Sequence, residues 1–354
     1  MFHYNLYIFY IYVVVVEFYN AINGETSKLK ADKSVFTIAD GIVQHLLVNS
    51  LYGDKFNEVV GEEEDSSVNI TVRPYTVEDL AVPAEFYELI DITRTKIETL
   101  SEQLNEHNYK GYNVFIDPID GTREFSTNLG EQCSICIGFA ESVQGKPVAG
   151  LVYRPITTPP TWAAGAASEN VTMGELDMAT TPTTNGYLTS NGGISKFILN
   201  LMAELQYTRV PSGGAGNKML MLLEGKGNCY IQDRGVSRWD TCWAQAVIEA
   251  YGGILMKLSP FIKSKGLESY TYKKSSLNLD FEAGCANLTA YNVNDKSIVK
   301  KGEVQPATDI NQMKPYSNLC GLLALDKNSS TPESIETVYS AIMKAQATNA
   351  ASYD

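Results

Sequence analysis

The strongest candidate for chemistry is the hexapeptide Asp117-Pro118-Ile119-Asp120-Gly121-Thr122. The apolar run Tyr112–Ile116 before it predicts a buried strand that delivers Asp117 at its end, and Pro118 fixes the turn that follows. We expect Asp120 to return toward the same point, where two carboxylates would repel each other unless a cation lay between them. Hard oxygen ligands of this kind suit Mg²⁺, which keeps water and substrate phosphate among its ligands.

The end of the same motif could bind phosphate. Gly121 and Thr122 open the next segment, where backbone N–H groups can hold a phosphate oxygen and the Thr122 hydroxyl can orient a water. A lone Asp-x-x-Asp fits a simple Asp-capped turn equally well.

Two further acidic motifs weaken that simpler interpretation. Glu62 and Glu63 follow the apolar pair Val59-Val60, although alone they would form a solvated acidic run. Trp239-Asp240-Thr241 places a carboxylate at a predicted helix start, where a structural N-cap is the ordinary role.

Composition and charge exclude several classes of protein. The chain has 354 residues, with 41 acidic and 28 basic side chains and a net charge of −13 at pH 7. This balance argues against a general binder of nucleic acids or anionic membranes, because both need a basic face. Residues 1–130 carry 21 acidic and 9 basic side chains, so nearly all of the excess lies there.

Cysteine and histidine usage narrows the chemistry. Six cysteines are too sparse for a disulfide scaffold, and three histidines lie in no triad-like context. Cys133 and Cys136 form a Cys-x-x-Cys, but no second pair or nearby histidine completes a zinc set. The apolar run Cys133–Phe139 predicts buried strand residues instead.

The N-terminal segment Phe2–Val16 is uncharged and rich in Tyr, Ile and Val. It is shorter than the roughly 20 residues of a transmembrane helix, and it lacks the basic region and cleavage site of a signal peptide. We expect an element packed on the protein, with a membrane-related segment as the alternative.

The elements around these motifs alternate between helices and strands, which predicts layered α/β packing. The periodicity predicts helices over 38–47 with a stop at Gly53, 75–107, 194–205, 213–223, 239–251 and from Thr331, a hairpin of 133–139 and 147–153, and a strand over 228–232. The Thr-, Pro- and Gly-rich stretch 179–186 places a domain boundary near residue 182, giving domains 1–182 and 183–354.

Together, the acidic motifs resemble those of the lithium-sensitive, magnesium-dependent phosphatase superfamily that includes inositol monophosphatase. Its signatures are a Glu-Glu pair, Asp-Pro-Ile/Leu-Asp-Gly/Ser-Thr, and Trp-Asp before a helix that ends in Gly-Gly. All three occur here in that order, and the resemblance extends over about residues 29–325. It implies a layered αβαβα sandwich, with an α+β first half that carries most metal ligands and an α/β second half.

The resemblance also implies metal ligands and catalytic residues. Asp117, Asp120 and Asp240 would bind one Mg²⁺, and Glu62 with Asp117 and the Ile119 carbonyl a second. Asp40 with Glu62 would hold a third through waters, and Glu63 would steer Glu62. Thr122, hydrogen-bonded toward Asp40 or Glu62, would orient the water that attacks phosphorus, which makes Asp40, Glu62 and Thr122 the expected catalytic residues.

Substrate would be bound mainly by the second half. The expected residues are Gly121, Thr122, Thr189, Ser190, Gly214, Ala215, Lys218 and Asp240. The glycine-rich stretch Gly213–Lys218 lacks the P-loop pattern, so we expect its backbone to approach the substrate and Lys218 to neutralise a second phosphate. The alternatives are a surface lysine for Lys218 and a helix cap before Ile194 for Thr189 and Ser190.

Two branches of the superfamily compete for the substrate. Gly213–Lys218 and Arg238–Cys242 resemble the 3′(2′),5′-bisphosphate nucleotidases, which act on 3′-phosphoadenosine 5′-phosphate. Thr37–Gln44, Gly61–Leu80 and Glu131-Gln132-Cys133 resemble the inositol polyphosphate 1-phosphatases. We expect removal of the 1-phosphate from inositol polyphosphates such as inositol 1,4-bisphosphate, with nucleotidase activity as the alternative or as a second activity.

The remaining expectations complete the interpretation, and those on nucleic acid and membranes follow from the acidic charge balance described above. They are two to three Mg²⁺ ions, Li⁺ as an inhibitor, a small-molecule phosphate ester as partner, no nucleic acid, no stable membrane association, a monomer, and a cytoplasmic location. A phosphate-sensing pseudophosphatase and a sugar bisphosphatase are the other classes to be tested.

Overall fold

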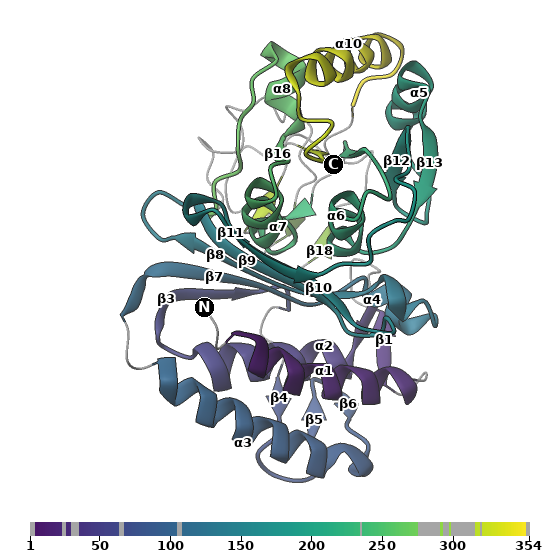
Figure 1. Cartoon of the computed structure of the whole chain (residues 1–354). Coiled ribbons are helices and arrows are strands. Elements are labelled where there is room, and N and C mark those ends of the chain that lie inside the picture. The colour runs from purple at the N-terminus through teal and green to yellow at the C-terminus, as the bar shows by residue number, and fades with distance from the viewer. Residues whose placement is uncertain are drawn as a thin grey trace.

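The structure alternates helical layers with two β-sheets (Figure 1). It is a computed structural model that describes residues 4–22, 26–29, 35–63, 67–104, 108–233, 236–274, 291–292, 297–298, 316–318 and 321–351.

The first sheet has six strands in the order β11-β10-β9-β8-β7-β3. They are β3 (Phe56–Gly61), β7 (Tyr109–Asp120), β8 (Ser134–Glu141), β9 (Pro147–Arg154), β10 (Thr161–Ala166) and β11 (Val171–Glu175). β3 runs parallel to β7, and the other neighbours are antiparallel. The pairing of β8 with β9 confirms the predicted hairpin.

Three helices cover one face of this sheet: α1 (Tyr4–Asn20), α2 (Ile38–His45), which continues into a π-helical segment (Leu46–Tyr52), and α3 (Tyr87–Gln103). Ile11, Val14 and Val15 of α1 are fully buried in the core of this layer, which confirms the packed N-terminal element. None of the helices in the described ranges is both long and apolar enough to cross a membrane.

The second sheet has five strands in the order β13-β12-β14-β20-β16. They are β12 (Gly186–Thr189), β13 (Thr208–Pro211), β14 (Cys229–Gln232), β16 (Ile254–Lys257) and β20 (Leu322–Leu325). β12 is parallel to both β13 and β14, so the carboxyl ends of these three strands lie at one edge of the sheet. Ligands of open α/β sheets are commonly bound at such an edge.

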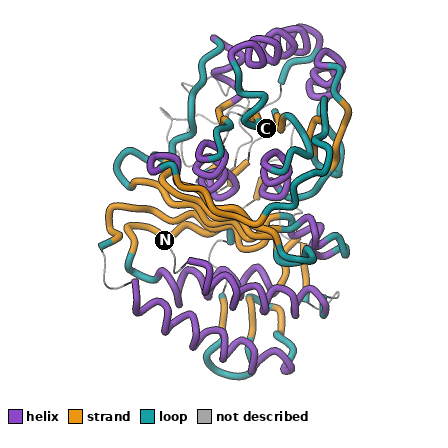
Figure 2. Tube along the Cα trace, in the orientation of Figure 1, coloured by secondary structure: helices purple, strands orange, loops and turns teal. Residues whose placement is uncertain are grey.

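Helices α6 (Ala215–Leu223) and α7 (Arg238–Ala250) lie between the two sheets, and the outer layer contains α5 (Lys196–Leu205), α8 (Leu258–Ser264) and α10 (Pro332–Thr348). Period-two alternation of side chains separates the layers. Leu188 packs in the core between the two sheets, whereas Tyr187 packs in the core between the second sheet and the outer helices. In the first sheet, Phe115 packs in the core between the sheets, while Val114 packs in the core formed with α1, α2 and α3. The five layers confirm the predicted αβαβα sandwich (Figure 2).

The shorter elements are β1 (Ser27–Leu29), β2 (Val35–Thr37), β4 (Val68–Asn69), β5 (Thr76–Val77), β6 (Leu80–Ala81), α4 (Thr122–Ser126), β15 (Val236–Ser237), β17 (Tyr291–Asn292), β18 (Ser297–Ile298), β19 (Ser317–Asn318) and 3₁₀ turns at Ala84–Phe86, Gly130–Gln132 and Ala167–Glu169.

The helix expected over 75–107 is wrong in its first third. β5 and β6 pair there as part of a small three-stranded sheet, with Tyr75 and Val77 buried. Pro83 lacks an N–H group and precedes the turn that leads into α3. Between the two large sheets, the chain passes from Glu175 to Gly186, and the domain boundary near residue 182 stays a prediction within this connection.

Candidate active site

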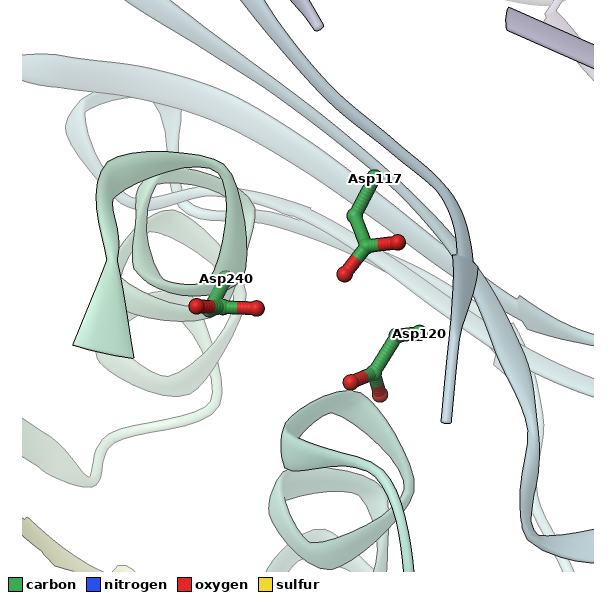
Figure 3. A group of neighbouring side chains, drawn as sticks. All are labelled: Asp117, Asp120 and Asp240. Carbon is green, nitrogen blue, oxygen red and sulfur yellow. The ribbon is translucent and has the colours of Figure 1, made fainter. Parts of the chain in front are cut away.

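Three carboxylates meet between the two sheets. One oxygen from each of Asp117, Asp120 and Asp240 lies within 4.8 Å of the others. Figure 3 shows the three side chains pointing toward one another, Asp117 and Asp120 from the end of β7 and Asp240 from the first turn of α7. The regular register of β7 with β8 is broken between Asp117 and Asp120, and both residues are buried.

Glu62 joins this group from the neighbouring parallel strand. Its N–H group donates to the Ile116 carbonyl at 3.0 Å, which continues the pairing of β3 with β7 one residue beyond Gly61. Glu62 thereby lies beside Asp117, and its charge helps to raise the pKa of Asp117.

The pKa values of Asp117 and Asp240 are raised because several acidic groups are buried close together. Burial, followed by the charges of Glu62, Asp120 and Asp240, raises the pKa of Asp117 well above its ordinary value. Burial and the charges of Asp120 and Glu62 raise the pKa of Asp240 to about 8. Buried like charges favour protonation unless a cation neutralises them.

One oxygen of Asp117 indicates that these carboxylates suit such a cation. Its Oδ1 is buried and has no hydrogen-bond partner among the described residues. An unpaired buried oxygen within a set of hard carboxylate donors suits a divalent ion. The cluster could therefore hold a metal through Asp117, Asp120 and Asp240, with Glu62 beside it.

Two of the carboxylates are fixed by the same local device. Asp40 and Asp240 each occupy the third position of a helix, where a side-chain oxygen accepts the N–H group of the residue before the helix. Thr37 N donates to Asp40 Oδ2 at 2.8 Å, and Ser237 N donates to Asp240 Oδ2 at 2.6 Å. These capping boxes leave the Oδ1 atoms for other contacts.

The second oxygen of Asp40 meets Thr122. The Thr122 hydroxyl lies 3.0 Å from Asp40 Oδ1 and 3.0 Å from the Ile119 carbonyl, both of which can accept its hydrogen. Gly121, with φ of +89°, turns the backbone between Asp120 and the short helix α4. The structure thus brings together Asp40, Ile119 and Thr122 directly after the carboxylates of β7.

Glu63 is placed by its backbone. Its N–H group donates to Gln44 Oε1 at 2.8 Å, and Gln44 Nε2 donates back to the Glu63 carbonyl. This amide clamp from α2 fixes the chain immediately after Glu62, and the Glu63 side chain is buried.

The glycine-rich segment Gly213–Lys218 contacts Asp120 through its backbone. Ala215 N donates to Asp120 Oδ1 at 2.8 Å, and Gly216 N donates to Oδ2 at 2.6 Å. A Cβ atom at Gly216 would lie 2.8 Å from the same oxygen, so only glycine permits this approach. The Ala215 N–H group thus already binds Asp120, and the approach of this segment's backbone to substrate stays a prediction.

Lys218 is buried, which makes the surface alternative wrong. Its ammonium donates to the Gly214 carbonyl and to the Ser212 carbonyl at 3.4 Å, and it lies 5.1 Å from the centre of the Tyr230 ring. Burial lowers the pKa of Lys218, while the charges of Asp120, Glu124 and Asp240 oppose that shift. A buried cation thus faces the carboxylate cluster.

Thr189 ends β12 at the carboxyl edge of the second sheet and Ser190 follows it. Neither caps a helix, because Ser195 caps α5. Arg209 Nε donates to Thr189 Oγ1 at 2.9 Å, and Arg209 Nη2 donates to the Ser190 carbonyl at 2.8 Å. The helix-cap alternative is therefore wrong for both residues.

Sequence analysis missed a bridge between the two halves. Gln132 Oε1 accepts from Gly213 N at 2.6 Å and from Asn191 Nδ2 at 2.8 Å, and Asn191 also donates to Glu124 at 3.0 Å. Ligands of parallel sheets bind beyond the carboxyl ends of the strands, so the segments after β12 and β13 could have been recognised from the sequence as candidate parts of the site.

Cys133 and Cys136 are buried free thiols. Cys133 donates to the Gly121 carbonyl, and Cys136 lies within β8. Burial is the largest cause that raises both thiol pKa values well above the ordinary range, so neither is a reactive thiolate. The prediction of buried residues is confirmed for both, and that of a strand for Cys136 only, because Cys133 directly precedes β8.

The solved structures that resemble this fold share little sequence with it. The extragenic suppressor protein suhB of Bartonella henselae superposes with a TM-score of 0.54 at 13% identity, over 94% of each chain. The IMPase of Thermotoga maritima gives 0.56 at 11% identity, over 98% of this chain and 100% of that one. These likenesses concern the fold alone.

Curated relatives are similar in sequence over a shorter region. The Golgi-resident adenosine 3′,5′-bisphosphate 3′-phosphatase of Callithrix jacchus is 31% identical over 152 residues, 41% of this chain and 42% of that protein. The 3′(2′),5′-bisphosphate nucleotidase 1 of Mus musculus is 30% identical over 154 residues, 40% of this chain and 48% of that protein. The chain thus spans less than half the length of these relatives.

A model of the inositol monophosphatase family matches residues 10–280, a range that contains all of the carboxylates described above. With its αβαβα layers and its cluster of Asp117, Asp120 and Asp240, the chain belongs to the inositol monophosphatase family.

Proposed function

We propose that this protein is a Mg²⁺-dependent phosphomonoesterase that hydrolyses one phosphate of a 3′(2′),5′-bisphosphate nucleotide. The observation that carries the chemistry is the buried cluster of Asp117, Asp120 and Asp240, with an unpaired oxygen on Asp117. The printed names of the sequence relatives support the substrate class.

The proposed role of each residue follows from its position in the site. Asp117, Asp120, Asp240 and Glu62 would hold the divalent ions, which when bound supply charge neutralisation and Lewis-acid activation of water. The hydroxyl of Thr122, donating to Asp40, keeps its lone pairs available to receive a hydrogen bond from the attacking water. Lys218, near enough to Asp120 and Asp240 for their charges to oppose the lowering of its pKa, would supply a positive charge for a second phosphate.

This proposal reverses the order expected from the sequence motifs. Inositol polyphosphate 1-phosphatase activity was the first expectation and the nucleotidase the alternative, whereas the sequence relatives support the nucleotidase. The segment Thr37–Gln44, which carried much of the inositol resemblance, has a structural role here: Thr37 and Asp40 form the cap of α2, and Gln44 clamps Glu63.

Phosphate release from two substrates tests the proposal. With Mg²⁺, we expect 3′-phosphoadenosine 5′-phosphate to be preferred over inositol 1,4-bisphosphate by more than about tenfold in kcat/KM, or roughly 1.4 kcal/mol. The opposite preference would restore the inositol branch, and turnover of neither would reject both. Parallel assays with Li⁺ test inhibition, which the resemblance implies.

Location and assembly are separate parts of the proposal. We propose a cytoplasmic monomer, and the net charge of −13 supports the monomer, because a net charge far from zero keeps copies of a protein apart. Some relatives are named as Golgi-resident, so fractionation with compartment markers distinguishes the two locations, and light scattering measures the mass.

A further inference from the structure

A buried ion pair joins the first sheet to the end of helix α6. Arg154, the last residue of β9, and Glu224, which follows α6, are both almost completely buried. Their contact is bidentate: Nη1 lies 2.6 Å from Oε1, and Nη2 lies 3.1 Å from Oε2. A guanidinium fork that meets both carboxylate oxygens fixes orientation as well as distance.

The same guanidinium also holds the body of the helix. Arg154 Nη2 donates to the Asn217 carbonyl at 3.1 Å, and Asn217 Nδ2 donates to Ser212 Oγ at 2.6 Å. Lys218 follows Asn217 directly, and its ammonium reaches the Ser212 carbonyl. Arg154 is thus linked through one turn of α6 to the segment that lines the site.

Helix α6 is therefore held at both ends by residues of the first sheet. Asp120 accepts the N–H groups of Ala215 and Gly216 at the start, and Arg154 binds Glu224 after the end. At 1.5 Å per residue these two attachments are about 12 Å apart along the helix axis. Two fixed points at this separation define both the tilt and the axial position of α6.

Stability alone does not account for this pair. Burying two charges costs desolvation that their attraction often fails to recover, and well-packed apolar residues of similar volume would do as well. Arg154 Nε is buried without a hydrogen-bond partner among the described residues, which adds to the cost. The pair does, however, supply directional contacts that apolar side chains would not.

We infer that Arg154 is a positioning residue, which sets α6 so that its first N–H groups bind Asp120 and Lys218 faces the carboxylate cluster. This inference rests on the proposed function for its kinetic consequences. Loss of the fork would let α6 shift, weaken the hold on Asp120, and move the charge meant for the second phosphate.

The substitution Arg154→Lys tests this inference, because it removes the bidentate guanidinium contact and keeps the positive charge. In Arg154→Lys one ammonium cannot make the bidentate contact and also reach the Asn217 carbonyl, so we expect about a 10- to 100-fold loss in Mg²⁺ affinity, measured by calorimetry on the whole chain. We also expect KM for 3′-phosphoadenosine 5′-phosphate to rise more than kcat falls. The control is Glu268→Gln, which removes the Lys257–Glu268 ion pair of the second half and should leave both quantities unchanged.

A second variant covers the case in which Arg154→Lys does not fold. Arg154→Met with Glu224→Met replaces the pair by apolar side chains, which should fold but show the same losses in Mg²⁺ affinity and KM. Normal Mg²⁺ affinity and KM in either folded variant, with only a lowered Tm, would show a purely structural pair and overturn the inference. Failure of both variants to fold would overturn it as well, because the pair would then be a requirement of folding.

Should the unaltered chain bind Mg²⁺ yet hydrolyse neither bisphosphate, the proposed function fails, while calorimetry still decides the role of Arg154.

Discussion

The hydroxyl of Thr122 lies 3.0 Å from Oδ1 of Asp40, although 82 positions separate the two residues in the chain. Asp40 is oriented for this contact because its other oxygen accepts both the N–H group and the hydroxyl of Thr37. A threonine hydroxyl has one hydrogen and two lone pairs, so donation to Asp40 leaves it an acceptor toward water. The helix cap of α2 thereby sets the direction of the hydrogen bond between Thr122 and Asp40.

Removal of this hydroxyl should affect turnover and little else. We expect Thr122→Ala to lower kcat by about 10²–10⁴-fold, because the acceptor for the attacking water is lost. Thr122→Ser keeps the hydroxyl and should retain most of the activity. Steady-state kinetics with matched Tm measurements check this, and equal kcat in the two variants would contradict the role.

Asp117→Asn tests the metal cluster more cleanly than Asp120→Asn does. Asp117 Oδ1 makes no hydrogen bond within the described chain, so the amide should leave the fold intact while it abolishes turnover. Without metal, the variant lacks a buried carboxyl group whose pKa is raised on folding, so its Tm at pH 8 should be higher, and the rise in Tm on Mg²⁺ addition should disappear. Asp120→Asn would also turn an amide group against Ala215 N or Gly216 N, at a cost of about 1–3 kcal/mol. Near-normal turnover in Asp117→Asn would refute the metal assignment.

The metal-free protein should become less stable as the pH rises. The pKa of Asp240 is about 8 in the folded state and has an ordinary value of 3.8. Between these values the folded protein keeps a proton that the unfolded chain has released, so the free energy of unfolding falls as the pH rises through this window. The burial-raised pKa of Asp117 acts in the same direction.

Calorimetric scans in chelator from pH 5 to 8 measure this slope. Mg²⁺ should stabilise the protein more at pH 8 than at pH 6, because protons compete with the ion for the carboxylates. A Tm that rises steadily over this range without metal would contradict the prediction.

Gly216 should not tolerate a side chain. In Gly216→Ala the new Cβ would meet Ser134 Oγ and lie 2.8 Å from Asp120 Oδ2, so α6 or Asp120 must move. We expect a loss of about 1–3 kcal/mol in the free energy of unfolding, together with weaker Mg²⁺ binding. Gly192→Ala is the matched control, since a Cβ there meets nothing within 4 Å. Denaturant unfolding of the two variants should separate them clearly.

The sequence predicts the local parts of this site well and the long-range ones poorly. Asp117 follows an apolar run, and Asp240 follows a capping serine, so each could be placed on its element from its neighbours alone. The layered fold followed from the alternation of helices and strands. The early part of the 75–107 segment was assigned wrongly because its acidic composition suggests helix, while burial of Tyr75 and Val77 favours strands.

Contacts across the two halves were beyond such reasoning. The glycines before α6 indicated close approach, but the partner, Asp120, lies 95 positions from Ala215. Lys218 sits on a short helix buried on most sides, so periodicity does not distinguish a surface cation from a buried one. The Gln132 bridge joins an amide to a loop from another sheet, and no local pattern encodes that pair.

The balance of fixed charge in the site also constrains the order of events. Five carboxylates gather here, those of Asp40, Glu62, Asp117, Asp120 and Asp240, and the buried Lys218 lies near two of them, Asp120 and Asp240. A bisphosphate is itself a polyanion, so the ionised carboxylates of this site repel it, most strongly at a pH above the Asp240 pKa of about 8. The potential changes sign only after divalent cations have been taken up, so metal should precede substrate in an ordered binding sequence. The acidic residues would then exclude free phosphorylated metabolites from the metal-free protein.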